Sequence, residues 1–110
     1  MIDSICVVVK SPPGEERATL GIRTSYATLM SSMETKVLFM DEGVYNLLEN
    51  PGYHTVTLKE VIREDGEVYC TREGLKSRGL PEEALLQGVR VIPESEVAGI
   101  VEVCRSVAVF

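Results

Sequence analysis

The chain has 110 residues, enough for one domain, and its 45% hydrophobic and 25% charged residues are close to globular averages, which excludes a disordered protein. A formal net charge of −6 argues against a broad basic surface, so we expect no direct nucleic-acid binding beyond a small local patch. No apolar run approaches the roughly 20 residues that span a bilayer, and the start, Met1-Ile2-Asp3-Ser4, lacks the features of a signal peptide. Three widely separated cysteines do not form a disulfide framework, and a reducing, cytoplasmic setting is expected.

Short apolar runs rich in β-branched residues predict strands that are buried on both faces. Five such runs occur, at residues 5–9, 37–40, 67–70, 89–92 and 107–110. Glycine, proline or helix-starting residues follow the first four of them. This pattern is typical of a parallel sheet whose strands are joined by helices.

Helices are predicted between these runs, at residues 17–33, 44–48, 57–64, 72–78, 81–87 and 93–105. The first has apolar residues three or four positions apart, which predicts a core-facing stripe whose methionines would also suit a subunit interface: Ala18, Ile22, Tyr26, Leu29, Met30 and Met33. Thr57 and Glu60 have the spacing of a capping box, which predicts a helix that begins there. Thr71 is a predicted N-cap, and Gly79 a predicted left-handed residue after the helix end.

Strands that alternate with helices favour parallel pairing and right-handed crossovers. The predicted fold class is therefore α/β, a three-layer α/β/α sandwich with a mainly parallel five-stranded sheet. Residues 1–110 are predicted to form a single domain, without an internal repeat or a linker.

Cys70 is the strongest nucleophile at a predicted strand-to-helix junction, where reactive groups gather in open α/β sheets. A helix that begins directly after Cys70 favours the thiolate, and Arg72, Lys76 and Arg78 add positive potential. The small side chain of Thr71 would leave the sulfur approachable. The same position also suits an inert cysteine buried at a strand end, and the basic residues also fit a solvated helix face. Position alone does not decide between these interpretations.

The other candidate groups are weaker. Cys6 lies within an apolar strand and Cys104 shares a helix face with valines, so both are predicted to be core residues. His54 is the single histidine and is predicted to lie in a surface loop, where it cannot form a metal site alone. The cysteines form no CxxC pair and the chain has no glycine-rich phosphate loop. We therefore predict no metal and no organic cofactor.

Four segments resemble the DsrE/DsrF-like family, which includes the Tus sulfur-relay subunits. In chain order they are Val9–Gly14, Asp41–Asn46, Cys70–Leu80 and Val107–Phe110. The most specific is the third, in which a cysteine is followed by a basic helix that ends in Arg-Gly-Leu. The resemblance covers essentially the whole chain and favours the DsrEFH-like form of the predicted fold.

The resemblance implies a small cytoplasmic protein without a cofactor that assembles into homo- or hetero-oligomers, trimers or hexamers. In carrier members, a cysteine matched by Cys70 bears persulfide sulfur, received from a donor protein and passed to an acceptor in sulfur oxidation or tRNA thiolation. This implies a catalytic, sulfurtransferase-like role for Cys70, with Thr71, Arg72, Lys76 and Arg78 supporting the thiolate or contacting a partner. Other members are non-catalytic structural or regulatory subunits. The chain has features of both branches, so both functions stay open.

Overall fold

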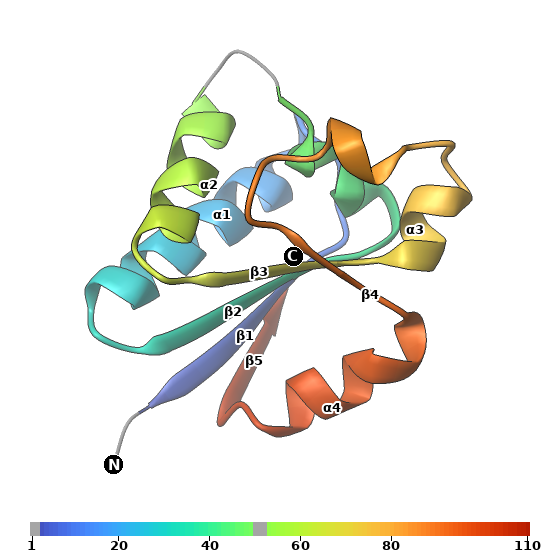
Figure 1. Cartoon of the computed structure of the whole chain (residues 1–110). Coiled ribbons are helices and arrows are strands. Elements are labelled where there is room, and N and C mark those ends of the chain that lie inside the picture. Colours follow the sequence, from blue (N-terminus) through green and yellow to red (C-terminus); the bar gives the residue numbers. More distant parts are fainter. Residues whose placement is uncertain (1–2, 50–52) are drawn as a thin grey trace.

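The computed structural model describes residues 3–49 and 53–110, which form a five-stranded sheet with helices on both faces (Figure 1). Every strand pairing is parallel, and the strand order is β4-β3-β2-β1-β5. The strands are β1 (Ser4–Val9), β2 (Glu34–Phe39), β3 (Glu67–Thr71), β4 (Arg90–Ile92) and β5 (Ser106–Val109). The predicted α/β class with its parallel sheet is confirmed.

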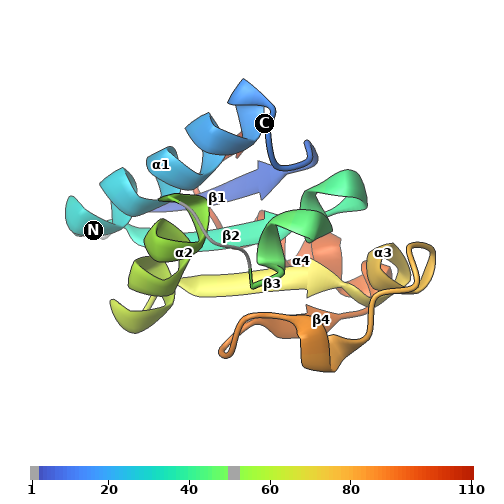
Figure 2. The ribbon, with the colours of Figure 1, turned by 90° about the horizontal axis from the view of Figure 1, so that it is seen from above.

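The two faces of the sheet are covered unequally. The α-helices are α1 (Glu16–Met30), α2 (Tyr53–Arg63), α3 (Arg72–Lys76) and α4 (Val97–Glu102), and the 3-10 helices are η1 (Asp41–Leu47), η2 (Glu82–Ala84) and η3 (Glu94–Glu96). Helices α1 and α2 lie side by side on one face, whereas the short α4 lies on the other (Figures 1 and 2). Helix α3 follows the carboxyl end of β3 (Figure 2). In the described part of the chain, every helix is too short or too polar to span a membrane.

The predicted core stripe of α1 is only partly buried. Ile22 is buried as predicted, whereas Tyr26 and Met30 are exposed. Gly21 faces the sheet instead, and a Cβ at Gly21 would lie 2.9 Å from a methyl carbon of Val9. Because α1 approaches the sheet through this small residue, the larger side chains on its flank stay outside the core.

Helix α2 begins at Tyr53, ahead of the start predicted at Thr57. The predicted capping box of Thr57 and Glu60 is wrong, because Thr57 is a buried residue inside the helix. His54 does not lie in a surface loop: it is part of α2, half-buried, with Nε2 2.9 Å from the hydroxyl of Thr19.

The long helix predicted at residues 93–105 is instead a 3-10 turn, η3, followed by the six-residue α4. Gly99 lies in the middle of α4, and Val97, Ile100 and Val101 are β-branched, so this segment has weak helix propensity. As a result, Cys104 lies beyond the helix, in the loop that leads to β5.

The start of η1 packs directly against the carboxyl end of β1. The amide of Gly43 donates to the carbonyl oxygen of Met40 at 2.8 Å, and the amide of Met40 donates to the carbonyl oxygen of Val9 at 3.0 Å. A Cβ on Gly43 would lie 2.1 Å from that Val9 oxygen, so a side chain does not fit. The turn after β2 therefore requires glycine at this position.

We predict that Gly43→Ala lowers the free energy of unfolding by about 1–3 kcal/mol, the usual effect of overpacking a core. Gly99→Ala is the matched control, because a Cβ there meets no atom within 4 Å and replaces glycine inside a helix. That variant should gain about 0.5–1 kcal/mol. Urea unfolding followed by circular dichroism measures both changes. Equal stability of Gly43→Ala and the unsubstituted protein would show that η1 does not pack as described.

Candidate functional site

Cys70 lies at the carboxyl edge of the sheet, as predicted, one residue before the end of β3. In the sheet it pairs with Phe39 of β2 and Val91 of β4. Its side chain belongs to the core cluster that also contains Val44 of η1 and Leu75 of α3. The residue has 0% exposure. The sulfur is thus at the predicted end of the strand but enclosed by packed side chains.

The Cys70 thiol is not activated. Burial raises its pKa to about 12, and the negative charge of Glu82 acts in the same direction. The amides at the start of α3 could favour a thiolate, but one of them already has a partner: the amide of Gly74 donates to the hydroxyl of Thr71 at 3.3 Å. The expectation of an exposed, readily ionised sulfur is therefore wrong for this conformation: the thiol is protonated at neutral pH.

The supporting residues predicted around Cys70 do not converge on it. Thr71 is the N-cap of α3, as predicted, and is buried. Arg72 and Lys76 are exposed on α3. Arg78 folds back on its own segment, where Nη1 donates to the carbonyl oxygen of Gly74 at 3.1 Å. Arg72 and Lys76 thus lie on the outside of α3 and Arg78 lies beyond its end, and the charge that acts on the Cys70 pKa is that of Glu82.

Tight packing between α3 and η1 closes the carboxyl end of β3 over Cys70. A Cβ on Gly74 would lie 2.7 Å from the Thr71 hydroxyl oxygen and 3.2 Å from a methyl carbon of Val44. The backbone of Asp41 is also close to Gly74. Access to the sulfur therefore requires the side chains packed around it, among them those of Val44 in η1 and Leu75 in α3, to move.

The other two cysteines differ from each other. All three cysteines are free thiols. Cys6 is fully buried in β1, as predicted. Cys104 was predicted to be a core residue on a helix face, but it is only half-buried, because the helix ends before it. Cys104, rather than Cys70, is therefore the cysteine that solvent reaches in this structure.

A charged network that sequence reasoning missed lies at the amino ends of β2 and β3. The Lys36 ammonium is 2.6 Å from Glu67 Oε2, and the Tyr69 hydroxyl donates to Glu67 Oε1 at 2.7 Å. Arg90 contacts the same carboxylate at 3.1 Å and lies 5.7 Å from the centre of the Tyr69 ring. Hydrogen bonds from Lys36 and Tyr69 lower the pKa of Glu67. The parallel register, which pairs Lys36 with Glu67 and Tyr69 with Arg90, brings these residues together.

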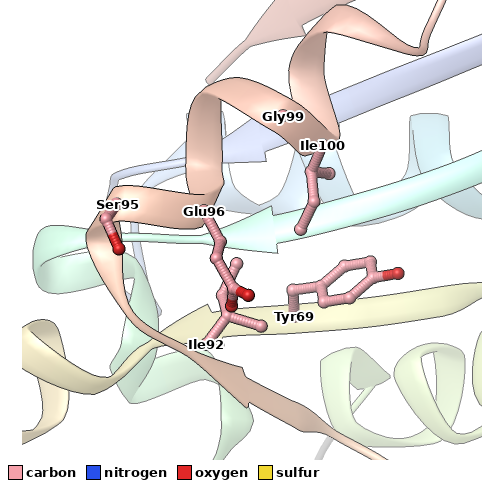
Figure 3. Close-up of a pocket in the computed structure, with 6 residues that line it drawn as sticks. All are labelled: Tyr69, Ile92, Ser95, Glu96, Gly99 and Ile100. Atoms are coloured by element: carbon pink, nitrogen blue, oxygen red, sulfur yellow. The ribbon is translucent and has the colours of Figure 1, made fainter.

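A hollow lies between part of α4 and the sheet (Figure 3). It is lined by Tyr69, Ile92, Ser95, Glu96, Gly99 and Ile100. Tyr69 and Ile92 come from the sheet, and Ile100 faces them from α4 (Figure 3). The lining is mostly apolar, with one carboxylate at the rim. Among the residues at 3–49 and 53–110, no three His, Cys, Asp or Glu side chains are grouped so that they could hold a metal ion.

We predict that iodoacetamide labels Cys104 of the native protein roughly 100-fold or more faster than Cys70, because Cys104 is half-buried whereas Cys70 is fully buried, and thiolates are the reactive species. Raising the pH from 7 to 9 should accelerate labelling of Cys104 and leave Cys70 unlabelled, since the Cys70 pKa is about 12. Peptide mapping by mass spectrometry measures each site, with urea-unfolded protein as the control in which all three cysteines react. Similar native rates at the two sites would contradict the enclosure of Cys70.

Comparisons with known proteins agree with this fold. The family model described as "DsrE/DsrF-like family" matches residues 3–110. The chain is 30% identical to the uncharacterized protein MK0008 of Methanopyrus kandleri, over 99% of this chain and 95% of that protein. It is 27% identical to the uncharacterized protein MJ0989 of Methanocaldococcus jannaschii, over 94% and 96%.

Two solved structures share the fold. The ychN protein from E. coli superimposes with a TM-score of 0.86 at 20% identity, covering 100% of both chains. A protein of unknown function, MTH1491 from Methanobacterium thermoautotrophicum, superimposes with a TM-score of 0.78 at 19% identity, covering 98% of this chain and 99% of the other. The family as a whole is associated with sulfur relay between partner proteins. By its family match over nearly all of its residues, this chain belongs to the DsrE/DsrF-like family.

Proposed function

We propose that the chain is a non-catalytic, oligomer-forming subunit of a cytoplasmic sulfur-relay system and that it does not carry sulfur on Cys70. The observation that carries this proposal is the enclosed Cys70 sulfur, with 0% exposure and a pKa of about 12. Attack on a donor persulfide requires a thiolate that the donor can reach. At pH 7, a thiol with this pKa is ionised in roughly one molecule in 10⁵.

A surface suited to assembly lies along β5. Val107 and Val109 are 47% and 61% exposed, and Val103, in the loop before β5, is 67% exposed. Strand β5 pairs with β1 on one side and forms the border of the sheet on the other. The sequence Ser106–Val109 contains no charged residue, although the whole chain has a net charge of −6. Two copies of this acidic chain would repel each other least if they made contact along this uncharged segment.

The two borders of the sheet differ in how they are protected. Natural proteins shield free sheet edges by short strands, charges or prolines. Strand β4 fits this rule, because it has three residues, begins with Arg90 and is followed by Pro93. Strand β5 is also short, with four residues, but it carries neither a charge nor a proline, and an uncharged edge with exposed valines is expected to be covered. We infer that it pairs with β5 of a second copy about a twofold axis, a contact compatible with a hexamer.

Persulfide carriage on Cys70 is the second candidate function, favoured by the place of Cys70 at the carboxyl edge of β3 and by the family. The Cys70 thiolate would attack the outer sulfur of a donor persulfide, form Cys70–S–SH and release the donor thiolate. An acceptor thiolate would then take the terminal sulfur and restore the Cys70 thiolate. Exposed Arg72 and Lys76 would contact the partner. This mechanism requires the side chains packed around Cys70 to move during the reaction.

We predict that the native protein gains no sulfur atom on Cys70 when it is incubated with a cysteine desulfurase and cysteine, because the donor persulfide cannot reach a protonated, enclosed thiol. Intact-protein mass spectrometry followed by peptide mapping locates any added sulfur. A Cys104→Ser variant removes the exposed thiol and keeps Cys70, so it should show no adduct. An adduct on Cys70 that disappears in Cys70→Ser would reject the non-catalytic proposal and establish the carrier.

We also predict that the protein is oligomeric and that Val109→Asp shifts it toward the 12.1 kDa monomer, because each of the two paired β5 strands would then carry a carboxylate on the same apolar surface, and like charges on paired strands are destabilising. Val56→Asp is the matched control, since Val56 is 62% exposed on α2, on the other face of the sheet. Light scattering coupled to size-exclusion chromatography gives the masses. A monomeric unsubstituted protein, or equal effects of the two variants, would rule out the β5 interface.

A further inference from the structure

Cys6 and Cys104 meet on the α4 face of the sheet although they are far apart in the sequence. Cys6 is buried in the cluster of this face with Leu38 and Tyr69, and Cys104 packs against the same cluster. The segment that carries Cys104 runs beside the beginning of β1, because the amide of Arg105 donates to the hydroxyl of Ser4 at 2.9 Å. From the sequence, these two cysteines are predicted to be separate core residues.

The two thiols interact with each other, and they are not equivalent. Burial raises the pKa of both, that of Cys6 to about 11. The thiol of Cys6 hydrogen-bonds Cys104, which lowers the pKa of Cys104 and raises that of Cys6, and the positive charge of Lys36 favours ionisation of both. Cys104 also has the solvent exposure that Cys6 lacks, and its Sγ lies 3.6 Å from the carbonyl oxygen of Ile100. Cys104 is thus the attacking thiol and Cys6 the neighbour that can resolve it.

We propose that Cys6 and Cys104 are a redox-active dithiol that closes to a disulfide between β1 and the loop after α4 when the protein meets a hydroperoxide. The Cys104 thiol releases its proton, and the thiolate attacks one oxygen of hydrogen peroxide. The O–O bond breaks, Cys104 becomes a sulfenic acid, and the other oxygen leaves as water with the released proton. The sulfur of Cys6 then attacks the sulfenic sulfur, the S–S bond forms, and the hydroxyl leaves as water with the Cys6 proton. In total, two thiols are oxidised to one disulfide and one peroxide is reduced to two waters.

Both residues pack in the same cluster, and one of them lies in a loop. A disulfide needs Cα atoms about 4.4–6.8 Å apart and side chains that point toward each other. Cys6 is fixed in an inner strand, whereas Cys104 is in a loop that can adjust. The bond would tie the end of α4 to the sheet. In a reducing compartment a small-molecule thiol reverses it, so the disulfide is transient there.

The experiment treats the reduced full-length protein with one equivalent of hydrogen peroxide and then alkylates it in denaturant. We expect two cysteines to escape alkylation, a peptide cross-link between Cys6 and Cys104, and full recovery of alkylation after dithiothreitol. Cys70→Ser should behave in the same way. Cys104→Ser should form no intramolecular disulfide, and because Cys104 is only half-buried in a loop and serine is close to cysteine in size, this variant is expected to fold.

A second variant tests the order of the two steps. In Cys6→Ser, oxidation should stop at the sulfenic acid of Cys104, which dimedone traps, whereas the unsubstituted protein should give roughly tenfold less dimedone adduct because Cys6 competes for the sulfenic acid. Oxidation of Cys104 without a link to Cys6, or a disulfide between two chains through Cys104, would overturn the proposal. The outcome is independent of the sulfur-relay assignment, because this assay contains no sulfur donor and reads no adduct on Cys70.

Discussion

The close approach of η1 to the carboxyl end of β1 is the contact on which the rest of this structure depends. Gly43 leaves no room for a side chain against the carbonyl oxygen of Val9, so η1 lies directly on the sheet. From there, Val44 of η1 reaches Gly74 of α3, and the two helical segments together close the end of β3. As a result, Cys70 is buried at the edge of the sheet where α/β proteins usually expose reactive groups.

The face of the sheet that carries α4 is less well covered than the face that carries α1 and α2. Helices α1 and α2, of 15 and 11 residues, cover one face, whereas the cover of the other is mainly the six-residue α4 (Figure 1). This thin cover leaves the hollow beside Tyr69, the exposed valines near β5 and the half-buried Cys104. A surface with apolar side chains and a free strand edge fits contact with another chain, and a half-buried thiol beside a second thiol fits redox chemistry. Both proposals therefore follow from the same lack of cover.

Family membership is consistent with sulfur carriage on Cys70, whereas the burial of Cys70 favours a non-catalytic subunit. The family is associated with sulfur relay, whereas the sulfur of Cys70 is protonated and enclosed in this conformation. A family can contain both carriers and partners built on one fold, because function depends on the particular site and not on the architecture. For this chain, the two functions differ in whether the Cys70 sulfur becomes accessible to a donor.

The sequence by itself determined the class of fold. Continuous apolar runs at regular intervals allowed few arrangements other than a parallel sheet with helices between its strands, and Thr71 and Gly79 marked the ends of α3 correctly because capping depends on neighbouring residues. Local patterns were misleading where tertiary contacts prevailed. The spacing of Thr57 and Glu60 imitated a capping box inside α2, and the predicted apolar stripe of α1 included Tyr26 and Met30, which lie outside the core.

Only the tertiary structure decided the candidate site. The position of Cys70 at a strand end could be predicted, but its exposure and pKa depend on how η1, from an earlier part of the chain, packs with α3, and on where the later Glu82 lies. The pairing of Cys6 with Cys104 and the ion pair of Lys36 with Glu67 arise in the same way, from strand register and loop placement. Desolvation and contact between groups far apart in sequence are properties of the packed molecule, and no local spacing encodes them.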